Sequence, residues 1–368
     1  MSESTPHTDQ QYMNRAIQLA RKGLFTTHPN PRVGCVLVKN DQIIGEGFHL
    51  KAGEGHAEVN ALAEAGEEAN SARCYVTLEP CSHQGKTPPC ADALIKAGIS
   101  EVFIAMQDPN PLVAGKGINK LKAAGINVTV GLCEAQAEGL NPGFIKRMRT
   151  GLPYVRVKIG ASLDGRTAMA SGESQWITSG ASRKDVQRWR AKSSAILTGV
   201  DTVLADDPSM NVRDADIEMA GRQPLRVVLD SQFRFPKNAK MARLAGETLI
   251  MTGLEIEQDN ALQVKINSDY KIDLENALRE LAKREINEVL VEAGPTLSGA
   301  LIQAGLVDEL ILYLAPKLLG GAAKPLVHLP GLEKLADCVQ LDIQSMKTIG
   351  QGADQNIRVI AHVLDIKS

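Results

Sequence analysis

One histidine, one glutamate and two cysteines in the first quarter of the chain have the residue types of a catalytic metal site. His56 and Glu58 lie two positions apart in "GEGHAEVNAL", and eight residues separate Cys81 from Cys90 in "PCSHQGKTPPC". Zinc prefers four tetrahedral ligands, and a catalytic zinc keeps one of these positions for water. We therefore predict that one imidazole and two thiolates, from His56, Cys81 and Cys90, bind a zinc ion.

The glutamate in this set indicates hydrolytic chemistry. Zinc lowers the pKa of a bound water to about 7, so hydroxide forms at neutral pH. The pattern His-x-Glu followed by Pro-Cys-x-x-Cys is typical of zinc-dependent nucleobase deaminases. In these enzymes the glutamate moves protons and does not bind the metal. We predict this role for Glu58. The cysteine spacing is longer than in that pattern and predicts a bulged loop, which Gly85 and two prolines favour.

Other interpretations of these residues remain open at this point. A His-x-Glu pair can occur by chance, and free cysteines are often core residues. Cys74 lies in a strand pattern and is predicted to be buried, but as a fourth ligand it would make the site a closed structural one. Residues two apart do not share a helix face, so His56 and Glu58 can face one metal only at an irregular first turn.

Alternating strands and helices are predicted to position these residues. Gly and Pro at segment ends, apolar runs and the turn pair Asn40–Asp41 mark the boundaries. We predict helices over 13–23, 56–66, 88–98 and 117–125, two strands joined as a hairpin over 33–50, and strands over 72–80, 99–106 and 126–131. Strands separated by helices indicate an α/β fold with a mostly parallel sheet.

The second half of the chain predicts another α/β layer structure. Its expected strands are Val155–Ile159, Ala195–Thr198, Leu225–Leu229, Thr248–Met251, Glu288–Val291 and Glu309–Leu314, and its expected helices are Ser182–Lys192, Leu274–Arg284 and Ser298–Ala304. The Gly- and Pro-containing segment 141–153 is predicted to be the linker. We therefore expect two domains, 1–150 and 151–368.

The composition limits the class of protein. The 368 residues are 43% hydrophobic and 23% charged, with a net charge of −2, so no strong field favours nucleic acid or an anionic membrane. The N-terminal residues lack a signal-peptide pattern, and the apolar runs are shorter than a bilayer span. We expect a cytoplasmic protein, in which clustered cysteines bind metal more often than they form disulfides.

Longer motifs add a resemblance to a known family. "THPNPRVGCVLV", "GHAEVNAL", "TLEPCSHQGKTPPC" and "DPNPLVAGKG" in the first half, with "KIGASLDGRTA", "SGESQWITS", "TVLADDPSMNVR" and "VEAGPTLSGAL" in the second, are similar to the bifunctional deaminase/reductase of riboflavin biosynthesis. The resemblance covers nearly the whole chain. It implies a cytidine-deaminase-like α/β/α sandwich followed by a dihydrofolate-reductase-like α/β domain.

The resemblance also implies two reactions on small pyrimidine ribosyl phosphates. The first is zinc-dependent deamination of 2,5-diamino-6-(5-phosphoribosylamino)pyrimidin-4(3H)-one, and the second is NADPH-dependent reduction of the ribosyl side chain to ribityl. The family pattern makes His56, Cys81 and Cys90 the zinc ligands and Glu58 the catalytic residue. It further implies a homo-oligomer. The positions that match substrate contacts of the deaminase are Asn30, His49, Lys86 and Asn110.

The second half lacks a GxGxxG fingerprint, and "EVLVEAGPTLSGALIQAG" stands in its place. A strand that ends at Glu292 and leads into a helix presents backbone N–H groups to a phosphate, and Gly294 and Gly299 are predicted to allow close approach of a ligand. By resemblance NADPH contacts Gly160, Ala161, Trp176, Thr178, Thr202, Asp206, Ser231, Gly294, Pro295, Thr296, Leu297, Ser298, Gly299 and Ala300.

The reductase substrate is expected at a neighbouring set of positions, which are Ser174, Arg190, Met210, Arg213 and Glu292. Arg190 and Arg213 fit as phosphate ligands, because a guanidinium binds phosphate through two parallel hydrogen bonds. Met210 stands where we expect leucine and keeps an apolar contact. Asp164 in "LDGR" is interpreted as part of a turn.

Two rival functions follow from the same residues. The first is a zinc-dependent nucleobase deaminase of RNA or nucleosides with an accessory C-terminal domain. Binding of RNA would need a basic groove lined by aromatic residues, and the chain is only 4% aromatic. The second is a zinc-stabilised binding module, in which Glu58 would be dispensable. Neither rival explains the motifs of the second half.

Overall fold

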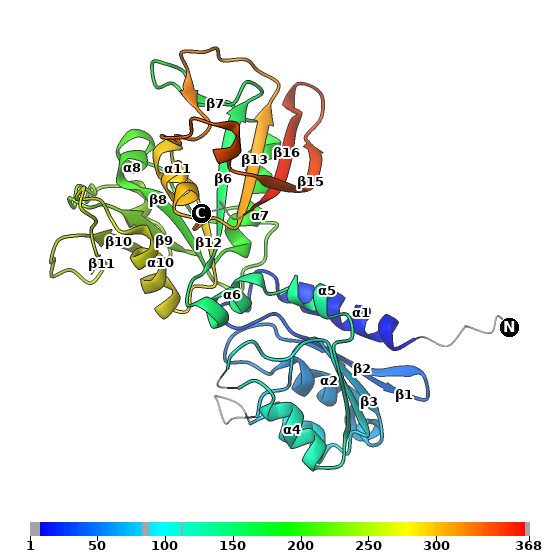
Figure 1. The fold of residues 1–368 in the computed structure, drawn as a ribbon. Coiled ribbons are helices and arrows are strands. Elements are labelled where there is room, and N and C mark those ends of the chain that lie inside the picture. The colour runs from blue at the N-terminus through cyan, green and yellow to red at the C-terminus, as the bar shows by residue number, and fades with distance from the viewer. Residues whose placement is uncertain (1–7, 83–87, 112, 365–368) are drawn as a thin grey trace. The chain divides into compact units, whose positions relative to one another are not determined.

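A computed structural model describes residues 8–82, 88–111 and 113–364. The chain divides into two compact units, Met1–Gly151 (unit 1) and Leu152–Ser368 (unit 2) (Figure 1). Each unit contains a sheet covered by helices, so the predicted α/β fold class is confirmed. In the part of the chain that the structure describes, no helix is long and apolar enough to cross a membrane.

The sheet of unit 1 has five strands in the order β2-β1-β3-β4-β5. β1 (Gly34–Lys39) is antiparallel to β2 (Gln42–Phe48) and to β3 (Arg73–Val76). β3, β4 (Glu101–Ile104) and β5 (Asn127–Val130) are parallel, and so their carboxyl ends lie at one edge. Asn40 and Asp41 join β1 to β2 with φ of 49° and 60°, the left-handed backbone of a tight hairpin turn, as predicted.

Helices cover both faces of this sheet and make it the middle layer of a sandwich. The first face packs on α2 (Ala57–Ala65), α3 (Cys90–Lys96) and α4 (Lys116–Ala123), through a core that includes Ala61, Leu94 and Leu121. The second face packs on α1 (Asp9–Ala20), α5 (Glu134–Glu138) and α6 (Pro142–Thr150). Short 3-10 turns, η1 (Arg21–Gly23) and η2 (Gly66–Ala69), extend α1 and α2.

The segment 141–153 is a helix over most of its length, where we predicted a linker. Pro142 occupies the first position of α6, a position that needs no N–H donor, and Gly151 with φ of 69° ends the helix. The two residue types that suggested a flexible segment therefore delimit a helix. The boundary between the units follows directly, after Gly151.

The sheet of unit 2 has nine strands in the order β11-β10-β9-β8-β12-β6-β13-β16-β15. The first seven in this order are parallel, and β16 and β15 add an antiparallel pair at one edge. Their bounds are β6 (Tyr154–Ser162), β8 (Ala195–Gly199), β9 (Leu225–Leu229), β10 (Thr248–Thr252), β11 (Ala261–Gln263), β12 (Glu288–Val291), β13 (Glu309–Ala315), β15 (Leu341–Ile349) and β16 (Asn356–Val363). All six predicted strands are present, whereas β11, β15 and β16 were not predicted.

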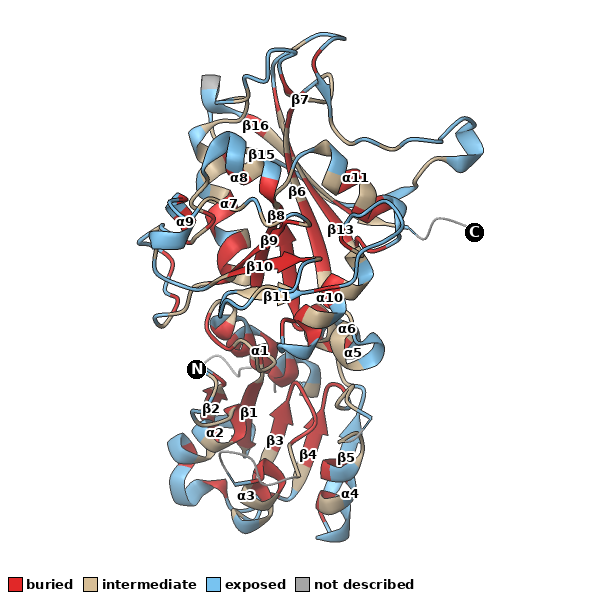
Figure 2. Ribbon diagram, turned by 90° about the vertical axis from the view of Figure 1, so that its left-hand side faces the viewer, coloured by how far each residue is buried: buried red, intermediate tan, exposed pale blue. Residues whose placement is uncertain are grey.

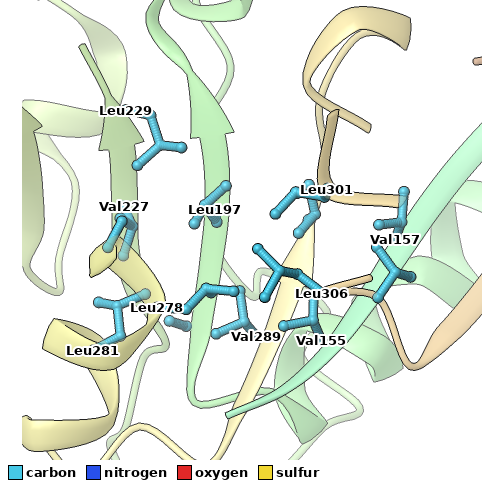
Figure 3. Close-up of a cluster of buried hydrophobic side chains, with 14 of the residues drawn as sticks. Val155, Val157, Leu197, Val227, Leu229, Leu278, Leu281, Val289, Leu301 and Leu306 are labelled. Atoms are coloured by element: carbon cyan, nitrogen blue, oxygen red, sulfur yellow. The ribbon is translucent and has the colours of Figure 1, made fainter. Parts of the chain in front are cut away.

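Five helices lie along this sheet, namely α7 (Gly180–Lys192), α8 (Val200–Asp206), α9 (Lys240–Arg243), α10 (Leu274–Lys283) and α11 (Pro295–Gln303). Figure 3 shows the main core, where Leu278 and Leu281 of α10 and Leu301 of α11 meet valines and leucines of the central strands. These strands are buried while the outer helix surfaces are exposed (Figure 2). Two short strands, β7 (Arg166–Ala168) and β14 (Lys324–Pro325), form a separate pair, and η3 (Leu335–Asp337) and η4 (Gly352–Asp354) are single turns.

Candidate metal centre and reductase cavity

The start of α2 positions the histidine and glutamate of the proposed metal site. His56 is the N-cap residue with extended backbone, φ of −71° and ψ of 165°, and Glu58 is the second residue of the helix. The pair therefore lies at the first turn, the arrangement that we required for both side chains to face one ion. Glu58 is 3% exposed.

The two cysteines lie side by side in the fold. Cys81 lies in the segment that follows β3, and Cys90 is the first residue of α3. The backbone N–H of Cys90 donates to Cys81 Sγ over 3.3 Å. His56 Nδ1 lies 3.2 Å from Cys90 Sγ and 3.7 Å from Cys81 Sγ. All three ligand atoms lie within 4.8 Å of one another, so one ion at ordinary Zn–S and Zn–N distances can reach them all. This donor set fits zinc with one position open.

The surroundings of the three side chains favour an ionised thiol. Hydrogen bonds from the Cys90 thiol, from His56 and from the Cys90 backbone N–H lower the pKa of Cys81 to about 4, although burial opposes them. The hydrogen bond with Cys81 raises the pKa of His56. Burial raises the pKa of Glu58 to about 7. These hydrogen bonds favour the thiolate form of Cys81, which is the form that binds a metal.

Asn30 and His49 lie beside this cluster. The His49 ring meets the His56 ring edge-on, with centroids 5.2 Å apart, and its Nδ1 lies 3.1 Å from the Gly55 carbonyl oxygen. A carbonyl only accepts, and burial lowers the pKa of His49, so Nδ1 carries the proton. Nε2 then accepts from Asn30 Nδ2 at 3.0 Å. Lys86 and the neighbouring His83 lie outside the described residues.

Cys74 is placed away from the three ligand candidates. It lies in β3, fully buried, and its Sγ is 3.5 Å from Cys35 Sγ in the neighbouring strand β1. Among the described residues, His56, Cys81 and Cys90 lie close enough together to share one metal ion, and Cys74 is not part of this group. The geometry thus gives no support to a closed site with four protein ligands.

Sequence reasoning did not single out Glu79, which organises the segment that carries Asn110. Glu79 is 4% exposed, and its carboxylate accepts four backbone N–H groups. The donors and distances are Asp108 at 3.1 Å, Gly115 at 3.0 Å, Gly117 at 2.9 Å and Ile118 at 3.2 Å. The one available signal was a charged residue at the end of a buried strand, since such a group requires partners.

Gly117 shows how closely this segment approaches the ligand loop. A Cβ at this position would lie 2.0 Å from the Pro80 carbonyl oxygen, so any side chain would force the two segments apart. Pro80 precedes Cys81 directly. Within the 108–118 segment the Asn110 N–H donates to Asp108 Oδ1 over 2.8 Å. Glu79 and Gly117 therefore fix the position of the Asn110 segment relative to a candidate zinc ligand.

Unit 2 contains a cavity of about 1830 Å³ near the carboxyl ends of its parallel strands. Most residues that we predicted for the cofactor line it, namely Gly160, Trp176, Thr178, Thr202, Asp206, Ser231, Gly294, Pro295, Thr296, Leu297 and Ala300. All five predicted for the substrate do so too, namely Ser174, Arg190, Met210, Arg213 and Glu292. Ala161, Ser298 and Gly299 are buried and are not among the lining residues.

The start of α11 fits a phosphate group of NADPH. Gly294 is its N-cap, and a Cβ there would meet no atom within 4 Å, so the backbone is open to a ligand. Ser298 in the first turn is fully buried, and its hydroxyl has no hydrogen-bond partner among the described residues. Gly299 differs from our expectation, because a Cβ there would lie 1.9 Å from the His328 carbonyl oxygen. The absence of a side chain at Gly299 therefore allows the backbone at His328 to pack closely against α11, and it does not serve the approach of the cofactor.

Arg190 is not a free phosphate ligand, in contrast to our interpretation of the sequence. Its Nε and Nη2 donate to the two oxygens of Glu292 over 2.6 and 3.0 Å. Lys158 Nζ lies 3.3 Å from the same carboxylate. Burial raises the pKa of Glu292, but Arg190 and Lys158 outweigh it and hold this pKa at about 2. Of the two predicted arginines, Arg213 is the one that is exposed in the cavity wall.

Of two further residues of unit 2, Lys158 lines the cavity and Asp164 is not among its lining residues. Lys158 was not predicted, although a lysine in the buried strand pattern "YVRVKIG" is itself a signal, since a buried ammonium requires a partner. Asp164 accepts from the backbone N–H groups of Leu319 and Gly320 and from the Ser162 hydroxyl, and Gly165 has φ of 70°. Asp164 therefore belongs to a turn, as predicted.

Comparisons with known proteins match both units. Residues 6–106 match the family described as cytidine and deoxycytidylate deaminase zinc-binding region, and residues 153–354 match the family described as RibD C-terminal domain. The riboflavin biosynthesis protein RibD of Escherichia coli strain K12 is 54% identical over 355 residues, which cover 93% of this chain and 97% of that relative. The chain belongs to the RibD family. The RibD of Haemophilus influenzae is 53% identical over 92% of this chain and 94% of its own length.

Solved RibD structures have the same fold along the whole chain. A structure of Acinetobacter baumannii RibD is 49% identical with a TM-score of 0.89, covering 97% of this chain and 99% of that one. A Thermotoga maritima structure is 32% identical with a TM-score of 0.85, at the same coverage. Membership of the RibD family makes the chain a bifunctional enzyme of riboflavin biosynthesis, with a deaminase domain and a reductase domain.

The RibD family also decides between the functions that the sequence left open. The zinc-binding deaminase region and the RibD reductase domain fit Zn²⁺ and NADPH, so the predicted cofactors and both enzyme activities are confirmed. A match over both units disfavours an RNA or nucleoside deaminase with an accessory domain. The fold class, a deaminase-like unit followed by a reductase unit, is confirmed as well.

Proposed function

We propose that the chain deaminates 2,5-diamino-6-(5-phosphoribosylamino)pyrimidin-4(3H)-one and then reduces the ribosyl side chain of the product to ribityl with NADPH. The observation that carries this proposal is the convergence of His56, Cys81 and Cys90 beside the buried Glu58. The Thermotoga maritima relative, described as a diaminohydroxyphosphoribosylaminopyrimidine deaminase/5-amino-6-(5-phosphoribosylamino)uracil reductase, supports the choice of substrates. We assign the deaminase to residues 1–150 and the reductase to residues 151–368.

In the deaminase, His56, Cys81 and Cys90 hold the zinc. When bound, zinc supplies a Lewis acid that makes water a nucleophile at neutral pH. Glu58, buried in the first turn of α2 two residues after His56, takes a proton from the water and returns protons to the leaving ammonia. Asn30, His49, Lys86 and Asn110 orient the substrate, and the Glu79 carboxylate keeps the Asn110 segment in place.

In the reductase, the backbone at the start of α11 and the cavity residues named above bind NADPH, which carries the hydride. Ser174, Arg190, Met210, Arg213 and Glu292 orient the ribosyl phosphate. Because Glu292 already occupies the Arg190 guanidinium, we assign the substrate phosphate to Arg213. Arg190 then acts by holding Glu292 ionised at the cavity wall.

The experiment that tests the proposal supplies the diaminopyrimidine ribosyl phosphate together with NADPH. Ammonia release and loss of NADPH absorbance are followed in the same sample. We expect ammonia to appear first and one NADPH to be consumed for each ammonia released. Ammonia release with no NADPH consumption would contradict the reductase assignment, and release from RNA at a comparable rate would contradict the substrate.

We also propose that the enzyme works in the cytoplasm as a homo-oligomer. A zinc site built on two thiolates supports a reducing compartment, because oxidised cysteines cannot bind the metal. Large apolar side chains exposed on the edge strand β15 support self-association.

A further inference from the structure

The strand order around the start of α11 gives the NADPH site a direction. α11 follows β12, which has β6 on one side in the sheet and β8 and then β9 on the other. The substrate groups Arg190 and Glu292 lie with Lys158 of β6. With its pyrophosphate at the start of α11, the cofactor reaches the substrate only if its nicotinamide lies on the β6 side. Its adenosine half then extends over the carboxyl ends of β8 and β9, and β9 lies about 10 Å from β12.

Arg234, which follows β9, presents a guanidinium to the cavity. Its side chain lines the cavity and is 44% exposed. Its Nη2 donates to Asp201 Oδ1 over 2.9 Å, but the side chain of Asp201 is itself 85% exposed. An ion pair between exposed side chains contributes little to stability. A phosphate can therefore replace Asp201 as the partner of this guanidinium at little cost.

A buried aspartate shapes the turn that carries Arg234. Asp230 is fully buried, and its Oδ2 accepts the N–H of Phe235 over 2.8 Å. Between them Phe233 has φ of 55°, a left-handed backbone that a bulky residue rarely adopts. Among the described residues Asp230 Oδ1 has no hydrogen-bond partner, and Arg234 Nε lies 3.9 Å from it. Because a buried polar atom requires a partner, we infer that the Nε edge faces Asp230 and leaves Nη2 for a ligand.

Other cations also line the cavity, but they fit this end less well. Arg183 donates to a backbone carbonyl oxygen over 2.8 Å and lies against an aromatic ring, with 4.4 Å to its centroid. Three lysines line the cavity as well, namely Lys240, Lys271 and Lys324. A guanidinium offers a phosphate two parallel N–H donors, whereas an ammonium is a point charge. Arg234 is therefore the best phosphate ligand at the adenosine end, and Lys271 offers a control in the same cavity.

We propose that Arg234 binds the 2′-phosphate of NADPH and so selects NADPH over NADH. The 2′-phosphate is the group that distinguishes the two cofactors, and it is attached to the adenosine ribose. On the path past β9 it meets the Arg234 guanidinium, which exchanges Asp201 for phosphate oxygens and keeps Nε beside Asp230. This role rests on the proposed reductase function and adds the residue that determines its cofactor specificity.

Fragments of the cofactor test the contact without turnover. Adenosine 2′,5′-bisphosphate contains the 2′-phosphate, and 5′-AMP lacks it. In calorimetric titrations of the full zinc-loaded chain, we expect Arg234→Gln to raise the Kd of the bisphosphate about 10–100-fold, because a charge-assisted contact is lost. The Kd of 5′-AMP should stay the same, which also shows that the variant is folded. Lys271→Gln removes one positive charge from the same cavity and should change neither Kd.

Removal of the competing carboxylate should have the opposite effect. Asp201→Asn frees the guanidinium of Arg234, so we expect the bisphosphate to bind about two- to fivefold more tightly and 5′-AMP to bind as before. Steady-state reduction provides a second readout. Arg234→Gln should raise the KM for NADPH and leave the KM for NADH unchanged.

Each contrary result has a distinct meaning. Equal weakening of both fragments by Arg234→Gln would show that this residue shapes the cavity and does not recognise the 2′-phosphate. Unchanged binding of the bisphosphate, or a selective loss in Lys271→Gln, would also overturn the assignment. All of these results leave reduction by the wild type in place. Failure of the proposed function would instead appear as a wild-type chain that releases ammonia without consuming NADPH.

Discussion

At the scale of single residues, two buried glutamates of unit 1 have different surroundings and therefore different expected roles. Glu58 lies beside the ligand cluster, and Glu58→Gln keeps the shape of the side chain while removing its proton transfer. We expect ammonia release to fall by about 10²–10⁴-fold with one zinc per chain retained, as measured by an ammonia assay and metal analysis. The matched control is Glu54→Gln at an exposed position. Full activity of Glu58→Gln would refute the assignment.

Glu79 is expected to act through structure. An amide in place of its carboxylate leaves two of four backbone N–H groups facing an NH₂ group, which should cost about 3 kcal/mol. We expect faster hydrogen exchange over 108–118 and a raised KM for the deaminase substrate, because Asn110 is displaced. Glu134→Gln, at an exposed position of α5, serves as the control. Unchanged exchange and KM would show that this carboxylate does not position the segment.

Arg213 tests whether the two sites are separate. Removing one charge-assisted contact to a phosphate should raise the KM of the reductase substrate about 10–100-fold. We expect Arg213→Ala to do so with ammonia release unchanged, followed in the two-readout assay. Arg243→Ala, an exposed position on α9, is the control. Equal loss of both activities would count against two independent sites.

At the scale of elements, sequence patterns predicted the strands and candidate ligands that depend only on residues close together in the chain. β9 and β12 match their predicted bounds, because segments rich in valine and leucine, such as "LRVVL", mark strands buried on both faces. β15 was missed because "LDIQSMKTI" is half polar, lies at an exposed edge and contains a bulge. His56 and the two cysteines could be predicted from residue type. The partners of Glu79 lie 29 to 39 positions away and those of Glu292 over 100, so no local pattern shows them.

Three elements meet in one charged cluster, with Lys158 in the middle of β6, Arg190 in the last turn of α7 and Glu292 directly after β12. This cluster predicts a dependence of stability on pH. The folded pKa of Glu292 is about 2, below its ordinary value of 4.5. A carboxyl whose pKa is lowered by folding stabilises the folded state above its ordinary pKa of 4.5, and this stabilisation is lost as the pH falls towards 2. For Glu292 the contribution to the free energy of unfolding is about 3 kcal/mol. Both tryptophans, Trp176 and Trp189, lie in unit 2 and report its unfolding.

Urea unfolding followed by tryptophan fluorescence measures this loss between pH 4.5 and 2. Glu292→Gln removes the titrating group, so we expect the variant to show a smaller decrease over the same range. Glu280→Gln, a partly exposed position on α10, controls for the loss of a carboxylate elsewhere in unit 2. If the free energy of unfolding decreases equally between pH 4.5 and 2 in the wild type and in Glu292→Gln, this cluster does not stabilise the unit.

At the scale of the whole molecule, each unit has hydrophobic clusters built from its own residues, so the two activities should be separable by removing zinc. The candidate ligands all lie in unit 1. We expect a zinc chelator to abolish ammonia release and added zinc to restore it. Reduction of the deaminated pyrimidine, supplied directly with NADPH, should keep its rate, and the tryptophan-detected unfolding midpoint should stay the same. Parallel loss of reduction would show that the reductase depends on metal-loaded unit 1.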